Sequence, residues 1–454
     1  MGTSARDLGR RVLGWLAPGF GVKRHALVLA LGAVLGALGL DALLGHSRFG
    51  AALSLEAAMG RAGVGTAAAA LLAGAALTVY AVGRITRSVV DAAIAPGVGR
   101  LFRVYPEAAL ASRGPRVVAI GGGTGLSVLL RGLKRYTWNL TAVVAVSDDG
   151  GSSGRLRAEL GMPPPGDIRN CLVALADTEP LMERLFQHRM AAGSGLKDHA
   201  FGNLFLAAMT EITGGDFERA IRESSRVLAV RGRVLPCTLT PVALRAELAD
   251  GTWLEGETRI GGAGAPIRRV HLVPERPRPL AEVLEAIAQA DLIVLGPGSL
   301  YTSIVPNLLV AGMAEALRGA SGLRVYVANI MTQPGETDGM DAADHVAALE
   351  AHGATVDAVV VNTARLSSSA LERYRREGAE PVAPAFDRLR ERGVRVVEAA
   401  LWSGKDGPVR HDSDALARLL VSLLLERRLD WGGRWGRGAR RAPATAEGGG
   451  WEGR

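Results

Sequence analysis

Residues 117–127, VVAIGGGTGLS, indicate the fold class more clearly than any other segment of the chain. A short apolar run leads into a glycine-rich turn, and the helical pattern SVLLRGLKRY follows directly. This succession is typical of a buried parallel strand that feeds a helix. Glycines at such a turn let the backbone approach a ligand closely, and the start of the helix offers free N–H groups. The segment predicts an anion-binding turn at the carboxyl end of a strand.

Five further apolar runs resemble the strand candidate at 116–120 and extend the predicted sheet. They lie at 141–146, 291–295, 323–329, 357–361 and 394–400, with helical patterns between several of them. Strands that alternate with helices predict an α/β fold with a Rossmann-like, doubly wound, mostly parallel sheet. Residues 233–273 differ, because they alternate apolar and polar side chains around a turn at 249–251. This pattern predicts a β-rich insertion.

Two apolar stretches precede this domain. Residues 26–45 carry one charge, Asp41, and residues 62–83 carry none. Each has about the 20 residues that a membrane-spanning helix needs, so the sequence predicts a transmembrane helical hairpin. Buried core helices, or a signal peptide for the first stretch, are the alternatives. Basic residues flank both outer ends, which places residues 1–25 and the main domain on the cytosolic side of the cytoplasmic membrane.

The remaining segments complete the predicted domain map. Residues 84–114 form a linker, residues 115–430 a nucleotide-binding domain that includes the insertion, and residues 431–454 a disordered tail rich in Gly, Arg and Ala. Two widely separated cysteines, Cys171 and Cys237, indicate a reducing compartment and no structural zinc. The net charge of +8 comes mostly from arginine, and no basic run is interleaved with aromatic residues, so no nucleic-acid partner is predicted.

The first glycine turn is the predicted phosphate-binding site. Its backbone and hydroxyl donors come from Gly121, Gly122, Gly123, Thr124, Gly125 and Ser127. The turn matches neither common fingerprint, since Leu126 stands where a dinucleotide motif has its third glycine and no P-loop lysine follows. A tight turn without a ligand is the alternative.

Polar residues also follow the second strand. Asp148 and Asp149 are candidates to hold a magnesium ion or to accept hydrogen bonds from ribose or substrate hydroxyls. An Asx-type turn with solvated carboxylates is the alternative.

Two predicted helix starts add further candidates. Asp167 is placed to cap a helix, with Arg169 available to a phosphate or to the Asp148–Asp149 pair, and Asn170 beside it. Asn203 opens another helix and offers an anion or base contact. His199 is the only candidate base in this region, but a lone histidine is more often structural.

Two later strands end in similar turns. Gly298 and Ser299 follow the strand at 291–295, and Asn329, Thr332 and Gln333 follow the strand at 323–329. Four apolar strands thus end in turns rich in small and polar residues. This repetition predicts one shared cleft at the carboxyl edge of the sheet.

Together these segments resemble the YvcK branch of the CofD-like family. The matching stretches are GGGTGLS at 121–127, SDDGGSSGRLR at 147–157, PPGDIRNCLVALA at 164–176, HAFGNL at 199–204, GPGSLYTSIVPNLLV at 296–310 and NIMTQPGETDG at 329–339. They occur in order and span roughly residues 115–415. The N-terminal apolar stretches and the tail lie outside the resemblance.

The resemblance implies a Rossmann-like fold, binding of UDP-sugars such as UDP-N-acetylglucosamine, and roles in cell shape, peptidoglycan synthesis and growth on gluconeogenic carbon sources. Envelope-synthesis proteins and a homo-oligomer are the partners it suggests. A regulatory protein that senses a nucleotide sugar is therefore our first expectation. The related CofD branch implies an alternative, a magnesium-dependent transfer of a phospho-acyl group to an alcohol, in which Asp148 or Asp149 contacts the acceptor. A nicotinamide-dependent oxidoreductase is a third, weaker hypothesis.

Overall fold

The computed structural model describes residues 22–44, 64–93, 114–177, 180–402 and 408–434 of the 454-residue chain. The chain divides into two compact units, Met1–Tyr105 and Pro106–Arg454. Most of the predicted N-terminal segment, linker and tail lies outside the described residues, at 1–21, 94–113 and 435–454.

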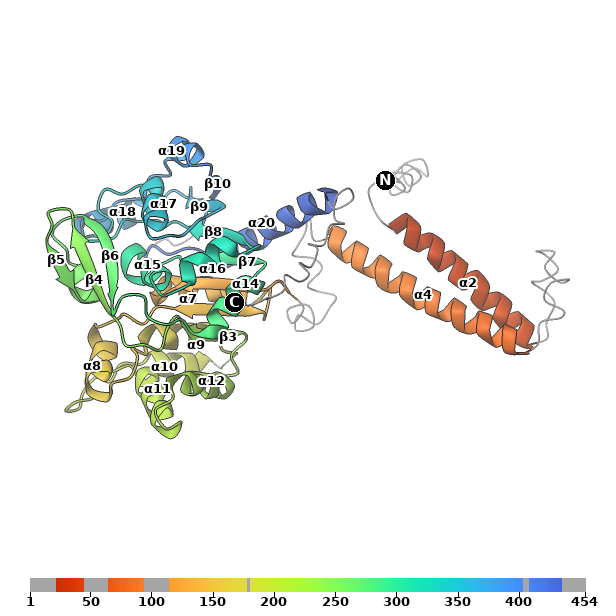
Figure 1. Cartoon of the computed structure of the whole chain (residues 1–454), viewed down its shortest axis with the longest axis horizontal. Helices are drawn as coiled ribbons and strands as arrows, with labels where there is room; N and C mark the ends of the chain where they lie inside the picture. Colours follow the sequence, from red (N-terminus) through yellow and green to blue (C-terminus); the bar gives the residue numbers. More distant parts are fainter. Residues whose placement is uncertain (1–21, 45–63, 94–113, 178–179, 403–407, 435–454) are drawn as a thin grey trace, which may run out of the picture. The chain divides into compact units, whose positions relative to one another are not determined.

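Two helices form the described part of the first unit, and they lie side by side (Figure 1). Helix α2 spans Val22–Leu44 and α4 spans Val64–Ala93, so they contain the predicted apolar stretches except for residues 45, 62 and 63, which lie outside the described residues. Their backbones approach closely at two glycines, because a Cβ atom added to Gly74 would lie 2.4 Å from the Gly36 nitrogen. Within the described residues, no single helix has the length and apolar character of a membrane span. One bent pair, Leu300–Leu308 with Met313–Gly319 at 79°, meets that requirement by length and composition.

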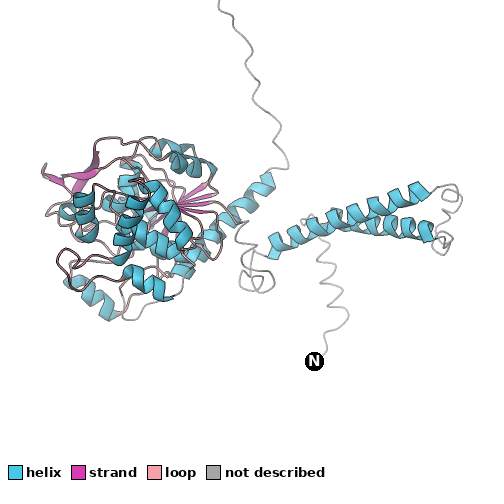
Figure 2. Cartoon of the chain, turned by 90° about the horizontal axis from the view of Figure 1, so that it is seen from below, coloured by secondary structure: helices cyan, strands magenta, loops and turns pink. Residues whose placement is uncertain are grey.

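Seven parallel strands form the main sheet of the second unit, in the order β10-β9-β8-β7-β1-β2-β3 (Figures 1 and 2). Their bounds are β1 Val117–Gly121, β2 Leu140–Val144, β3 Arg233–Pro236, β7 Leu292–Leu295, β8 Leu323–Val327, β9 Ala358–Asn362 and β10 Arg395–Ala399. The six predicted strands are confirmed with small shifts at their ends. The mostly parallel, Rossmann-like sheet is confirmed with them.

Helices cover both faces of this sheet, as a parallel sheet requires. The helical segments are α7 Gly123–Leu133, α8 Gly151–Leu160, α9 Gly166–Leu175, α10 Pro180–Gln187, α11 Phe201–Ile212, α12 Phe217–Val227, α14 Ala281–Gln289, η2 Leu300–Ile304, α15 Val305–Leu308, α16 Met313–Gly319, α17 Ala342–Ala351, α18 Ser368–Arg376, α19 Phe386–Glu391 and α20 Ser413–Arg434. Alternate residues of β1 point to opposite faces. Val117 and Ala119 pack with α7, α9 and α20, whereas Val118 and Ile120 pack with α14 to α17.

A separate antiparallel sheet occupies most of the predicted β-rich insertion. It consists of β4 (Ala243–Leu248), β5 (Trp253–Glu255) and β6 (Ile267–Val273), in the order β5-β4-β6, and the short helix α13 (Glu257–Ile260) lies between β5 and β6. The predicted insertion began too early, because residues 233–236 form β3 and pair with β2 in the main sheet. A four-residue edge strand is too short to be distinguished from the insertion by its pattern alone. Helix α20 also extends into the predicted tail, as far as Arg434.

The order of the strands reverses at β1. From β1 the chain adds β2 and β3 on one side, and after the insertion it adds β7, β8, β9 and β10 on the other side. The turns that follow β1 and β7 therefore leave the sheet next to each other at its carboxyl edge. In open α/β sheets this switch point is where ligands bind.

Candidate ligand-binding site

The two glycine turns at the switch point are in close contact. A Cβ atom added to Gly125 would lie 2.5 Å from the Pro297 carbonyl oxygen, and one added to Gly298 would lie 3.3 Å from the Gly122 oxygen. Side chains at these positions would push the turns apart. The glycines of both turns are therefore needed for the close approach of β1 and β7 beyond the sheet edge.

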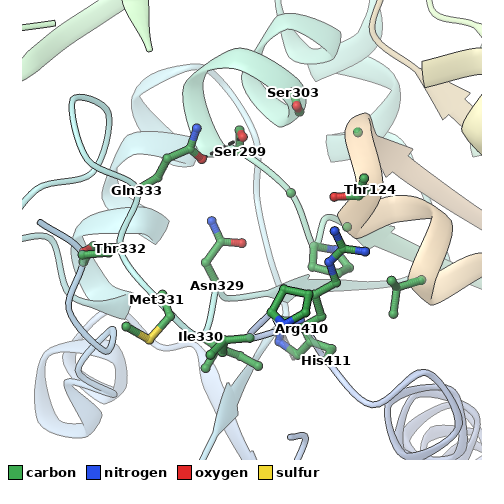
Figure 3. Close-up of a pocket in the computed structure, with 18 of the residues that line it drawn as sticks. Thr124, Ser299, Ser303, Asn329, Ile330, Met331, Thr332, Gln333, Arg410 and His411 are labelled. Carbon is green, nitrogen blue, oxygen red and sulfur yellow. Dashed lines mark hydrogen bonds between the residues drawn. The ribbon is translucent and has the colours of Figure 1, made fainter. Parts of the chain in front are cut away.

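A pocket of ≈ 380 Å³ lies above these turns (Figure 3). Its lining includes the predicted residues Gly122, Gly123, Thr124, Gly125, Gly298, Ser299, Asn329, Thr332 and Gln333. Three of the four predicted strand-end turns thus meet at one site. The pocket has the size of a small-molecule site and combines backbone groups, hydroxyls and amides on one part of its wall with apolar side chains on another.

The turn after β8 is joined to the turn after β7 by side-chain hydrogen bonds. Ser299 Oγ donates to Gln333 Oε1 at 2.7 Å, as the dashed line in Figure 3 shows. The buried Glu336 carboxylate accepts from the backbone N–H groups of Tyr301 at 2.6 Å and Thr302 at 3.1 Å. Burial raises the pKa of Glu336 to about 7, although these N–H donors act in the opposite direction.

Thr332 is bonded to a neighbouring loop, since its Oγ1 accepts from the Glu380 N–H at 2.8 Å.

Five lining residues with polar side chains were not predicted from the sequence: Ser303, Tyr374, Glu377, Arg410 and His411. Arg410 and His411 come from the segment between β10 and α20, and Figure 3 shows both beside Asn329. A signal for them did exist, because this segment also follows the carboxyl end of a predicted strand. The four strand ends on which the predicted cleft depends do not include that of the strand at 394–400.

The predicted residues after β2 lie outside this pocket lining. Asp148 Oδ1 accepts from the Gly150 N–H at 2.9 Å, which is the Asx-type turn considered as the alternative. Asp149 Oδ1 accepts from the N–H and Oγ1 of Thr258, at 2.9 and 2.8 Å. Asp149 therefore fastens the β2 turn to the start of α13 in the insertion.

Asp167 lies directly behind the first glycine turn. Its Oδ2 accepts from the Gly123 N–H at 2.6 Å, and a Cβ atom on Gly122 would lie 2.5 Å from the same oxygen. Burial raises the pKa of Asp167 to about 6, while the Gly123 N–H and the nearby Arg169 lower it. Helix geometry leaves the first amides of α7 without intrahelical acceptors. One of these amides is therefore already used by a carboxylate of the chain itself.

The other predicted residues form a buried hydrogen-bond chain among α8, α9 and α11. Arg169 donates to Asn203 Oδ1 at 3.0 Å and to Asn170 Oδ1 at 2.9 Å. Asn203 donates to Ser152 Oγ at 2.9 Å, and that hydroxyl lies 3.0 Å from His199 Nδ1. These residues hold three helices together, and none of them is among the lining residues of the pocket.

Ser127, in the first glycine turn, has a local partner, because its Oγ donates to the Thr124 carbonyl at 2.8 Å.

The acidic side chains of this region do not form a recognisable metal centre. Glu257 lies near Asp148, Asp167 and Asp149, and burial together with these charges raises the pKa of Glu257 to about 9. Within the described part of the chain, no group of three or more His, Cys, Asp or Glu side chains has an arrangement suited to a metal ion. The donor set therefore does not fit a magnesium ion held by the protein alone.

Comparison with protein families gives a match over all seven strands of the main sheet. The family model described as 2-phospho-L-lactate transferase CofD matches residues 117–402, from the first residue of β1 to just beyond β10.

Curated proteins and solved structures agree with this match. A gluconeogenesis factor of Bacillus subtilis is 51% identical over 314 residues, which are 69% of this chain and 99% of that protein. A putative gluconeogenesis factor of Nostoc is 46% identical over 422 residues, 90% of this chain and 91% of that protein. The crystal structure of a UPF0052 family member from Bacillus halodurans has a TM-score of 0.66 and 49% identity, and covers 68% of this chain and 99% of that one. The Nostoc match is too long to lie within the second unit alone.

Proposed function

Since this chain belongs to the gluconeogenesis factor (YvcK) group of proteins with a CofD-like domain, we propose that it binds a UDP-sugar and acts as a regulatory protein. UDP-N-acetylglucosamine is the first ligand to test. Through this ligand the protein would link carbon metabolism to cell-envelope synthesis and cell shape.

One observation carries the proposal, the contact between the two glycine turns beneath the pocket. Gly125 and Gly298 expose backbone on both sides of the β1–β7 switch point, where a diphosphate finds N–H donors and the positive end of the α7 dipole. The hydroxyls of Thr124, Ser299 and Ser303 line the same wall. Arg410 adds a guanidinium, the group that pairs best with phosphate oxygens.

A regulatory role is favoured over catalysis by the bonds that the candidate reactive groups already make. Asp149 is held by Thr258, and His199 is buried with its Nδ1 beside Ser152. Neither side chain is placed as a free base above the glycine turns. Ligand occupancy would instead fix the hydrogen-bonded turns around Ser299 and Gln333, and a partner protein would recognise that state.

A CofD-type transferase is the second candidate, favoured by the family match and by the position of Asp167 against the first glycine turn. In such a reaction magnesium would neutralise the phosphate oxygens, and the acceptor alcohol would lie on the side of Asp148 and Asp167. These side chains would orient that alcohol. Since the protein donors alone do not form a metal site, the nucleotide would have to supply further oxygen ligands.

Calorimetric titration of the purified full-length protein separates these functions. UDP-N-acetylglucosamine, UDP, GDP and NADH are titrated separately, and the bound nucleotide is then followed by chromatography for several hours with magnesium. Binding of the UDP-sugar without breakdown is the expected result. Breakdown or transfer to an added alcohol would favour the transferase. Preference for GDP or NADH over every uridine ligand would reject the proposal.

We also propose that α2 and α4 tether the protein to the cytoplasmic membrane, with the main domain in the cytosol. The whole of α2, with 23 residues, corresponds to about 34 Å of helix, against a hydrocarbon thickness of about 30 Å, whereas its described apolar part, Val28–Leu40, is by itself shorter than a span. The two helices meet through glycines, while Leu31, Leu72 and Val79 are more than half exposed on the outside of the pair.

To test this tether, membranes from cells producing the full-length protein are washed with alkaline carbonate. Retention in the pellet is expected, and release into the supernatant would overturn the tether.

A further inference from the structure

A second cavity lies at the amino edge of the main sheet, at the other end of the strands from the candidate ligand-binding site. This amino-edge cavity has a volume of ≈ 350 Å³ and shares no lining residue with the first pocket. It is formed around the starts of β1, β2 and β3 and the end of α14. Its polar side chains include Arg116, Asn139, Thr141, Arg233 and Gln289.

The register of the three strands puts the two arginines of this cavity on one face of the sheet. Thr141 of β2 pairs with Val118 of β1 and with Arg233 of β3. Paired residues of parallel strands point to the same side, and so do residues two apart along one strand. Arg116, two positions before Val118, therefore extends over the same face as Arg233. In agreement, Arg233 Nη2 donates to Thr141 Oγ1 at 3.3 Å.

The lining of the amino-edge cavity carries positive charge only. It contains Arg116 and Arg233 but no aspartate or glutamate. Among the residues that the structure describes, neither guanidinium forms an ion pair. Asp291 accepts from the backbone N–H of Arg116 at 2.8 Å, but Asp291 is not a lining residue. Two like charges that share a cavity repel each other, so a bound anion would stabilise the pair.

An adjoining cavity of ≈ 630 Å³ shows the contrast. It also includes Arg233, but there the arginines of α12 already have carboxylate partners. Arg222 is paired with Glu218, and Arg226 is paired with Glu223 at 3.2 Å. The smaller cavity is therefore the one that offers guanidinium groups to an outside anion.

The chemistry of the amino-edge cavity fits a small phosphate ester. Guanidinium groups bind phosphate oxygens through paired N–H donors, and two of them can hold one phosphate from two sides. The exposed Gln289 side chain makes no hydrogen bond to another described residue, so its amide is available to a hydroxyl. The volume of the cavity suits a compact group and excludes a whole nucleotide sugar.

We propose that the amino-edge cavity binds the phosphate of a small phosphate ester between Arg116 and Arg233, with a hydroxyl of the ester at Gln289. Glycerol phosphate is the simplest such ligand, either free in solution or as the headgroup of an anionic phospholipid. The chain enters the main domain from α4 at this edge, because Arg116 immediately precedes β1. The inference does not depend on the proposed nucleotide site.

Hydrogen exchange of the full-length protein in maltoside micelles, which contain no phosphate, tests the site in two arms. One arm adds soluble glycerol phosphate, with sodium chloride of equal ionic strength as the reference. The other adds phosphatidylglycerol to the micelles, with an uncharged diacylglycerol as the reference. In at least one arm, exchange at residues 232–236 is expected to slow about tenfold once the ligand exceeds its Kd by a similar factor.

The two arms distinguish the sources of the phosphate. Slower exchange with soluble glycerol phosphate alone identifies a free ester as the ligand, and slower exchange with phosphatidylglycerol identifies a lipid headgroup. No slowing in either arm would overturn the inference. Slowing confined to the glycine turn at 121–127 would overturn it too, since the phosphate would then prefer the first pocket.

Variants assign the effect to the two arginines. Arg116→Met should weaken binding about tenfold, because a charged hydrogen bond is lost, and Arg116→Met with Arg233→Met should abolish it. Arg219→Met with Arg259→Met is the matched control, since it removes the same charge from exposed positions outside the cavity. This control should respond as the wild type does.

Arg116→Lys with Arg233→Lys keeps both charges and should retain part of the effect. Unchanged exchange of the distant strand β8 in the absence of ligand shows that a variant is folded. Slowing that persists at full size in Arg116→Met, which changes an exposed side chain outside the strands, would overturn the assignment.

Discussion

The carboxylate of Asp167 accepts a hydrogen bond from the Gly123 N–H at 2.6 Å, at the start of α7 where a diphosphate is expected. The N-terminus of this helix therefore faces a negative charge of the chain itself. A bound phosphate must tolerate that charge or meet Asp167 in its protonated form. Burial favours the second case, because it raises the pKa of Asp167 to about 6.

Asp167→Asn is expected to increase the affinity for UDP by roughly tenfold at pH 8, because the amide keeps an acceptor for Gly123 but removes the charge near the phosphates. Below pH 6 wild-type Asp167 is mostly protonated, so the two proteins should bind UDP alike. Calorimetric titrations between pH 5 and pH 8 check this difference. Asp250→Asn, on an exposed turn of the insertion, is the control. Weaker UDP binding by Asp167→Asn at pH 8 would contradict this explanation.

Gly125→Ala should separate the two glycine turns, since the new Cβ would lie 2.5 Å from the Pro297 oxygen. We expect a loss of stability of roughly 1–3 kcal/mol and weaker UDP binding. Gly319→Ala is the matched control, because a Cβ atom there meets nothing within 4 Å. Urea unfolding and UDP titration of both variants check the prediction. Unchanged stability and binding in Gly125→Ala would show that the turns can move apart at no cost.

Arg410→Met should weaken UDP binding about 10- to 100-fold, while binding of uridine, which has no phosphate, stays the same. The effect should shrink at high ionic strength, because an exposed charge is screened by salt. Titrations at two salt concentrations check this, with Arg390→Met on α19 as the control. Equal losses for UDP and uridine would place Arg410 beside the base instead of the phosphates.

Glu336→Gln should remove part of the pH dependence of stability. The folded-state pKa of Glu336, about 7, lies above the model-compound value of 4.5, so the folded protein binds this proton more tightly. The contribution of Glu336 to stability should therefore be fully present below pH 4.5, be lost as the pH rises to about 7, and stay level above it. At pH 8 the variant should be more stable than the wild type by roughly 1–3 kcal/mol, because the amide oxygen still accepts from Tyr301 and Thr302 without a buried charge.

Urea unfolding at pH 5 and pH 8 checks this prediction, with the exposed Glu285→Gln as the control. At pH 5 wild type and Glu336→Gln should differ little, since the wild-type carboxyl is then mostly protonated. A variant that is less stable than the wild type at pH 8 would mean that the charged hydrogen bonds outweigh the cost of burial.

The strands and the first glycine turn could be predicted because their signals are local. The runs at 117–120 and 323–329 are apolar enough to be buried on both faces, and glycine and polar residues end each of them. The short strand β3 was assigned to the wrong sheet, because its four residues have no pattern that separates them from the insertion that follows. Its partner β2 lies about ninety residues earlier in the chain.

The chain itself determined the helix-and-strand alternation and the polar turns at the strand ends, because burial patterns and glycine turns act over a few neighbouring residues. Only the tertiary structure decided which of those turns share a pocket. In the folded protein β7 lies beside β1, and Arg410 and His411 line the same pocket as Asn329. Asp167, Arg169 and Asn203 are not among the lining residues, and they make hydrogen bonds within the protein instead. These placements depend on strand order and on contacts between distant segments, which no local pattern encodes.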